Sequence, residues 1–104
     1  MATSSIKTLW LNDDPRNYSE YVQFNDRKFK IRIRYTTSTC IGFNVDCALS
    51  IMTSNGSFTS IIDDRQAGIK FDQMLCYSTN INELIEANKN IIKEFKNFIK
   101  KVYA

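Results

Sequence analysis

The stretch from residue 28 to residue 35 decides the fold, and it reads Lys28-Phe29-Lys30-Ile31-Arg32-Ile33-Arg34-Tyr35. Basic and apolar side chains alternate at every position, which is the period-two pattern of a β-strand with one buried and one open face. The apolar set therefore predicts the core face, and the basic set predicts the open face. These sets are Phe29, Ile31, Ile33 and Tyr35 for the core, and Lys28, Lys30, Arg32 and Arg34 for the open face.

The segments around this strand predict more strands and then a helix. Residues 6–11, 21–24, 43–52 and 58–62 have strand-like composition and are separated by turn signals. Among these signals, Asn25-Asp26 predicts a tight turn, and Asn55-Gly56 predicts a hairpin with a type I′ turn. From Asn80, which is a good N-cap residue, apolar side chains recur at three- and four-residue steps up to Val102.

We therefore expect an α+β fold, with an antiparallel four- to five-stranded sheet followed by one long C-terminal amphipathic helix. The length of 104 residues predicts a single domain over residues 1–104, in which residues 1–19 are a candidate peripheral arm. The first residues lack the apolar segment of a signal peptide, and no apolar run is long enough to span a membrane. The chain is expected to be intracellular, in the cytoplasm or nucleus, and not secreted.

The composition excludes much catalytic and metal chemistry. The chain has no histidine, and its three cysteines form no Cys-x-x-Cys pair, so we expect neither a zinc site nor a Cys–His nucleophile. Acidic pairs such as Asp63-Asp64 fit turns better than acid–base sites. No cofactor and no enzymatic activity are expected. Heavy use of Ile, Asn and Lys indicates an AT-rich genome, such as that of a virus, a phage or a low-GC bacterium.

Two basic segments lie on an otherwise acidic chain. Residues 27–34 hold five cations and no acid, and residues 89–104 hold five lysines and one acid. Same-face residues of a strand are roughly 6.6 Å apart, so the four open-face cations form a row about 20 Å long, comparable with the phosphates of an extended single strand. Asp46, on the neighbouring strand, is expected to neutralise only one of them. Three aromatic residues near the row in sequence are candidates for stacking on bases, namely Tyr21, Phe24 and Tyr35, although Tyr35 shares the core parity.

Three interpretations of the basic row remain open. It can bind single-stranded DNA or RNA or another polyanion, it can be a solvated sheet face, or it can meet an acidic surface of a protein partner. In the last case the chain would be a small viral or mobile-element protein that modulates a host protein or takes part in an assembly. The lysines at the end of the helix fit an ordinary helix C-terminus.

The apolar stripe of the helix is longer and wider than a small sheet needs. Adjacent apolar pairs, such as Ile91-Ile92, broaden it. We therefore expect a homodimer formed through the C-terminal helix. Its predicted interface consists of Ile91, Ile92, Phe95, Phe98 and Ile99.

The order of these segments resembles the positive-cofactor-four family of single-stranded-DNA-binding transcription coactivators. The matching pieces are residues 31–34 as the basic strand, residues 45–56 as the next strand and turn, and residues 65–71 as the entry to the last helix. The strand at residues 48–51 lacks the arginine and large aromatics of that family. The resemblance implies a dimer through the helices that holds single strands across its sheets, as a transcription or replication factor would. It implies binding roles for Arg32 and Arg34, and a rim contact for Arg65.

Overall fold

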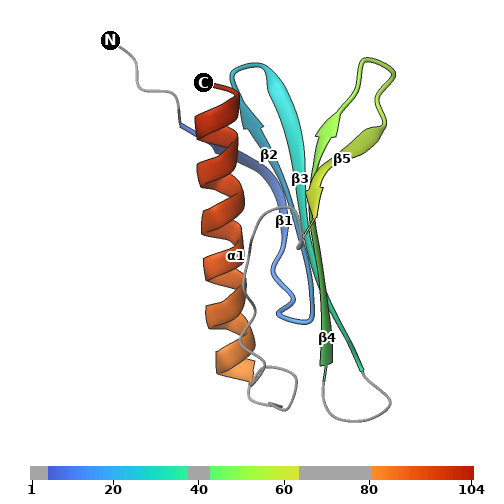
Figure 1. Cartoon of the computed structure of the whole chain (residues 1–104), viewed down its shortest axis with the longest axis vertical. Coiled ribbons are helices and arrows are strands. Elements are labelled where there is room, and N and C mark those ends of the chain that lie inside the picture. The colour runs from blue at the N-terminus through green and yellow to red at the C-terminus, as the bar shows by residue number, and fades with distance from the viewer. Residues whose placement is uncertain (1–4, 38–42, 64–80) are drawn as a thin grey trace.

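The computed structural model of the chain describes residues 5–37, 43–63 and 81–104 (Figure 1). It has a five-stranded antiparallel sheet in the order β1-β2-β3-β4-β5, followed by one C-terminal helix, so the predicted α+β class is confirmed. The elements are β1 (Lys7–Asn12), β2 (Asn17–Phe24), β3 (Arg27–Thr37), β4 (Phe43–Met52), β5 (Phe58–Asp63) and α1 (Ile81–Val102).

The alternating strand lies at the centre of the sheet, where β3 pairs with β2 on one side and β4 on the other. Its apolar side chains are buried, as the alternation predicts: Phe29, Ile31 and Ile33 have no exposed surface. The alternation of β2 has the same phase, because Val22 faces the core opposite Phe29. The buried face of the sheet is thus continuous across its central strands.

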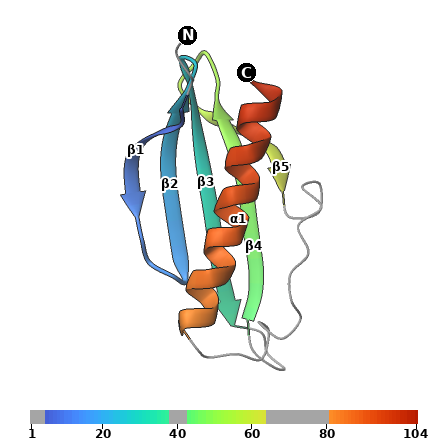
Figure 2. The ribbon, with the colours of Figure 1, turned by 90° about the vertical axis from the view of Figure 1, so that its left-hand side faces the viewer.

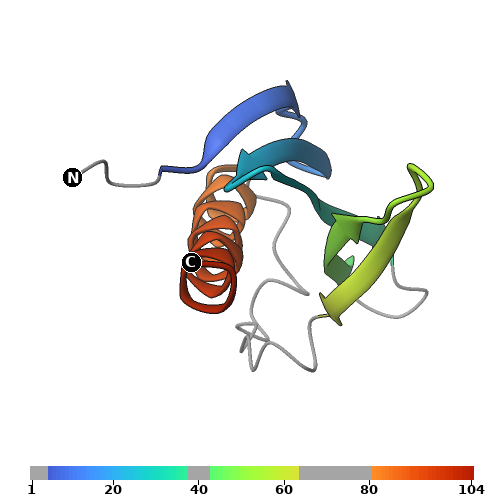
Figure 3. The same ribbon diagram turned by 90° about the horizontal axis from the view of Figure 1, so that it is seen from above.

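One helix covers this buried face. Figure 2 shows α1 lying obliquely across the sheet, and Figure 3 shows that the opposite face carries no helix in the described residues. The buried side chains of α1 fall at three- and four-residue steps, which is the pattern of one helical face. They are Leu84, Asn88, Ile91, Phe95 and Ile99.

This packing corrects the predicted dimer interface. Ile91, Phe95 and Ile99 are almost fully buried against the chain's own sheet, so they are not free to meet a second helix. Ile92 and Phe98 are half-buried and pack against the same core. The sequence suggests more apolar helix surface than the sheet needs, because it does not show how much of the sheet the helix covers. The homodimer itself stays a prediction.

Two buried polar groups fix α1 to the sheet. The Glu20 carboxylate accepts hydrogen bonds from the Thr8 hydroxyl at 2.6 Å, the Lys96 ammonium at 3.0 Å and the Tyr18 hydroxyl. Burial by itself would raise the pKa of Glu20, but the hydrogen bonds from these three donors outweigh it and hold the pKa below its ordinary value. Glu20 is therefore a buried carboxylate with its charge compensated from β1, β2 and α1.

The second group is Asn88. Its side-chain oxygen accepts a hydrogen bond from the Tyr35 hydroxyl at 2.7 Å, and its side-chain nitrogen donates to the carbonyl of Pro15 at 3.0 Å. Burial raises the pKa of Tyr35 to about 12. Tyr35 is thus a core residue that holds the helix in place.

The tight turn predicted at Asn25-Asp26 is present, and it has the geometry that the sequence predicts for Asn55-Gly56. Asn25 and Asp26, between β2 and β3, both have positive φ angles, 50° and 65°, as a type I′ turn requires. In the β4–β5 hairpin only Gly56 has a positive φ, 88°, so the predicted hairpin is present but its predicted type I′ turn is wrong. The Asn55 side-chain oxygen accepts a hydrogen bond from the Ser57 amide at 3.1 Å, and this contact favours a longer loop.

The stretch predicted as a peripheral arm takes part in the sheet. Residues 7–12 form the edge strand β1, which pairs with β2, and Tyr18 is buried. Within the described residues, no helix combines the length and the apolar character needed to cross a membrane.

Candidate nucleic-acid interface

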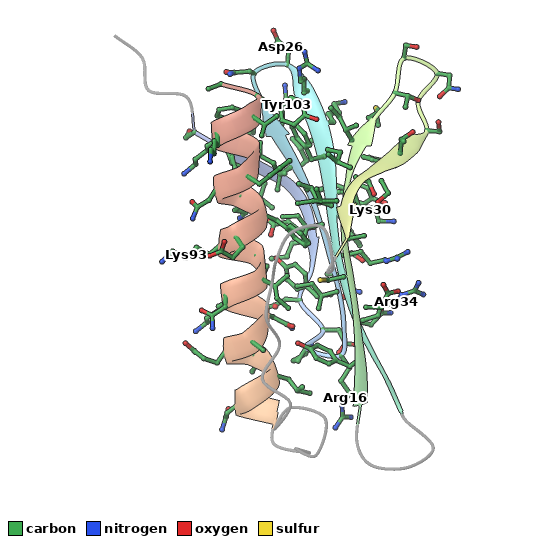
Figure 4. The ribbon with its side chains drawn as sticks, viewed as in Figure 1. Arg16, Asp26, Lys30, Arg34, Lys93 and Tyr103 are labelled. Carbon is green, nitrogen blue, oxygen red and sulfur yellow. The ribbon has the colours of Figure 1, made fainter. Side chains whose placement is uncertain are left out.

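The basic row lies on the open face of the sheet. Lys30 and Arg34 point away from α1, whereas Lys93 lies on the outer side of the helix (Figure 4). Lys28 and Arg34 are exposed, and Lys30 and Arg32 are half-buried between their neighbours. The alternation in β3 therefore places the cations as the sequence predicts, along one strand with its open side toward solvent.

An aromatic row crosses the same face. The ring centroid of Tyr21 lies 5.3 Å from that of Trp10 and 5.5 Å from that of Phe58, both in tilted geometry. Trp10 is half exposed. Tyr21 and Phe58 belong to β2 and β5, between which β3 and β4 intervene, so the contact between the two rings crosses the open face over these two strands.

The aromatic and basic rows meet at Lys30. Its ammonium nitrogen lies 5.5 Å from the centroid of the Tyr21 ring, in cation–π range, and the two residues are directly opposite each other in the β2–β3 pairing. The meeting point is set by the two-residue turn at Asn25-Asp26, which fixes the register of the hairpin.

A β-bulge brings Trp10 to this face. In the pairing of β1 with β2, Thr8 lies opposite Val22 and Trp10 lies opposite Tyr21, so Leu9 is an extra residue. A bulge shifts the alternation of a strand by one position. Thr8 therefore faces the buried side, where it reaches Glu20, and Trp10 faces the open side.

A shallow hollow of about 400 Å³ lies beside the two rows. Its small side chains, Ala48, Ser50 and Ser60, leave space between the longer ones around them. Lys30, Arg32 and Asp46 supply its charges, and Phe58 supplies an aromatic wall. Ligand pockets in proteins begin at about 300 Å³, so the hollow has room for a small planar group such as a base.

Asp46 contacts two of the arginines, not one as the sequence suggested. Its carboxylate Oδ2 lies 3.3 Å from Nη2 of Arg32 and 3.9 Å from Nη2 of Arg34. The pairing of β3 with β4 places Asp46 directly opposite Arg34 and diagonal to Arg32. Lys28 and Lys30 have no acidic partner within salt-bridge distance among the residues that the structure describes.

The structure changes the set of candidate residues. Lys28, Lys30, Arg32 and Arg34 share the open face. Tyr35 and Phe24 are 7% and 3% exposed in the core, so both are removed from the set. Arg65 lies outside the described residues. Tyr21 stays in the set, and Trp10 and Phe58 join it.

The signals for these three rings differ. The sequence contained the signal for Tyr21, because a two-residue turn at Asn25-Asp26 puts it opposite Lys30. The sequence contained no such signal for Trp10 and Phe58, because the bulge before Trp10 and the contact of Phe58 with Tyr21 depend on three-dimensional packing.

In comparisons with known proteins, no family model, no curated protein and no solved structure matches the chain. Among the described residues there is also no group of three or more side chains suited to hold a metal ion.

Proposed function

We propose that this protein is a non-enzymatic single-stranded nucleic-acid-binding protein that uses the open face of its sheet. The observation that carries the proposal is the meeting of a partly exposed aromatic row with a row of cations on one face. Proteins that bind single strands without sequence preference combine these same two elements. A role as a viral or phage accessory factor in transcription or replication, and membership of the positive-cofactor-four family, remain proposals that rest on the sequence.

The two rows have separate tasks in this proposal. The cations along β3 bind phosphates and release counterions, which gives affinity without sequence preference. The rings of Trp10, Tyr21 and Phe58 stack on bases, which is favourable by about 1–3 kcal/mol per base. Stacking needs bases that are not paired, so a single strand should bind more tightly than a duplex of the same length.

Fluorescence anisotropy with a labelled single strand of about 20 nucleotides tests the proposal over a range of salt concentrations. Three or four phosphate contacts predict a log–log salt slope between about −2 and −3. The double variant Arg32→Ala/Arg34→Ala should lose affinity and about 1.4 of this slope. Lys93→Ala/Lys100→Ala removes two charges from the exposed outer side of α1 and serves as the matched control. Absence of binding at low salt, or equal losses in both variants, contradicts the proposal.

A protein partner is the second candidate, and one observation favours it. The edge strand β1 exposes three consecutive large apolar residues, Leu9, Trp10 and Leu11, between 42% and 50%. An open strand edge with apolar side chains can add a strand from another protein, and the basic row would then meet acidic side chains. Capture of one partner that survives nuclease treatment and is lost in Leu9→Lys would favour this candidate over the first.

A further inference from the structure

The Asp46 carboxylate occupies the place between two guanidinium groups that a phosphate would take. Asp46 lies 3.3 Å from Arg32 and 3.9 Å from Arg34, and all three side chains are between 37% and 53% exposed. Arginine side chains bind carboxylate and phosphate with the same geometry, because both groups present two oxygens to the planar fork of donors. A ligand phosphate and Asp46 therefore compete for the same donors.

The contact with Asp46 leaves Arg32 incompletely paired. Nη2 of Arg32 donates to Asp46 at 3.3 Å, a long hydrogen bond, while its Nε has no hydrogen-bond partner within the described part of the chain. An arginine bound by a phosphate can instead use two donors at once. Turning the guanidinium from Asp46 toward a phosphate would exchange one long bond for two shorter ones.

We propose that Asp46 is an internal competitor for the phosphate site formed by Arg32 and Arg34, and that it lowers the affinity of the open face for phosphodiester ligands. The inference rests on the proposed function. Exposed ion pairs contribute only about 0.2–1 kcal/mol each, so a phosphate can displace the carboxylate. The Asp46 side chain, on the neighbouring strand, thus occupies the guanidinium donors until a phosphate displaces it.

The test compares Asp46→Asn with the wild-type chain by anisotropy with a single strand of about 20 nucleotides. Asparagine keeps the size of the side chain and removes its charge. Binding should become about three- to tenfold tighter, and the salt slope should steepen by about 0.7 for each phosphate gained. Glu86→Gln is the control, because it removes the same charge from an exposed acid on α1, 4.0 Å from Lys89, and it should change binding by less than about twofold.

A second background separates competition from a general charge effect. In the Arg32→Ala/Arg34→Ala chain, Asp46→Asn should tighten binding by less than about twofold, since the donors in dispute are gone. The inference is overturned if the wild type binds and Asp46→Asn binds equally or more weakly, or if Glu86→Gln gives the same gain. If neither chain binds, the proposed function falls together with the inference. Binding by Asp46→Asn alone would support the competition and contradict the function proposed for the natural chain.

Discussion

The ammonium nitrogen of Lys96 in α1 lies 3.0 Å from the carboxylate of Glu20 in β2, and Glu20 is 3% exposed. The next residue, Tyr21, faces the opposite side and carries the centre of the aromatic row. One short stretch of β2 therefore fixes the helix on one face and the candidate binding surface on the other.

Removal of the Lys96 charge should destabilise the fold. Lys96→Met leaves a buried carboxylate with hydrogen bonds from Thr8 and Tyr18 only, and we expect the free energy of unfolding to fall by about 1–3 kcal/mol. Urea denaturation followed by circular dichroism measures the change. Lys93→Met, at an exposed position of the same helix, should stay within about 0.5 kcal/mol of the wild type.

Glu20 should also shape the acid limit of stability. Its pKa is lower in the folded chain than the ordinary value of 4.5, so the unfolded chain takes up the proton first as the pH falls. The ionised Glu20 carboxylate therefore contributes its full share of the folding stability well above pH 4.5. This share is lost as the pH falls through the lower pKa that Glu20 has in the folded chain. Thermal midpoints between pH 7 and pH 3 should fall less steeply for Glu20→Gln than for the wild type. Glu94→Gln, which removes an exposed carboxylate, should follow the wild-type profile.

The burial of the Tyr35 hydroxyl predicts a loss of stability at high pH. Burial raises the pKa of Tyr35 to about 12, whereas its pKa in the unfolded chain is near 10. The buried neutral hydroxyl therefore contributes fully to folding stability below pH 10, and this contribution is lost as the pH rises toward 12. Tyr35→Phe should lower the free energy of unfolding at pH 7 by about 1–2 kcal/mol, since it leaves the Asn88 side-chain oxygen without this donor. It should also make stability less dependent on pH between 10 and 12. An unchanged alkaline profile would show that other groups cause the loss.

The two rows of the open face should be separable by salt. Tyr21→Leu removes a ring and no charge, so it should weaken binding of a single strand by about 1–3 kcal/mol with an unchanged salt slope. Arg34→Ala removes a phosphate contact, so its slope should be smaller by about 0.7. Trp10 is the only tryptophan, and stacking on a base should quench its fluorescence. A ring substitution that changed the slope as much as Arg34→Ala would contradict this division.

The β4–β5 hairpin offers a test of the turn geometry. Gly56 has a φ of 88°, and an added Cβ would meet nothing within 4 Å, so only the backbone conformation opposes a side chain there. Gly56→Ala should cost about 1–2 kcal/mol of unfolding free energy. Ser54→Ala, in the same loop but without a positive φ, is the control. If the two variants were equally stable, the positive φ of Gly56 would not limit which side chains this position accepts.

Much of the fold could be predicted from the sequence because its signals are local. The alternation of residues 28–35 sets the faces of β3, and the change of period after Asn80 predicts the helix that the structure describes from Ile81. Both turns could be located from the sequence, but not their types: Asn-Gly is the stronger type I′ signal, yet Asn25-Asp26 adopts the two positive φ angles.

The site was only half predictable, for a physical reason. The direction of each cation in β3 follows from its position alone, whereas the aromatic row joins residues from β1, β2 and β5. Trp10 depends on a bulge, which breaks the alternation that sequence reasoning relies on. For Ile91, Phe95 and Ile99, the choice between a core and a dimer role depends on the area of sheet that α1 covers, and no local pattern records that area.

The strict alternation of β3 has an evolutionary consequence. Within this strand, substitutions at residues 29, 31 and 33 change stability, and substitutions at residues 28, 30, 32 and 34 change the surface with little effect on the core. Point mutations can therefore change the charge of the open face without a loss of folding. A deletion of one residue would instead turn the cations inward and destroy both properties at once. The β3 strand should therefore accept substitutions on its open face but no change of length.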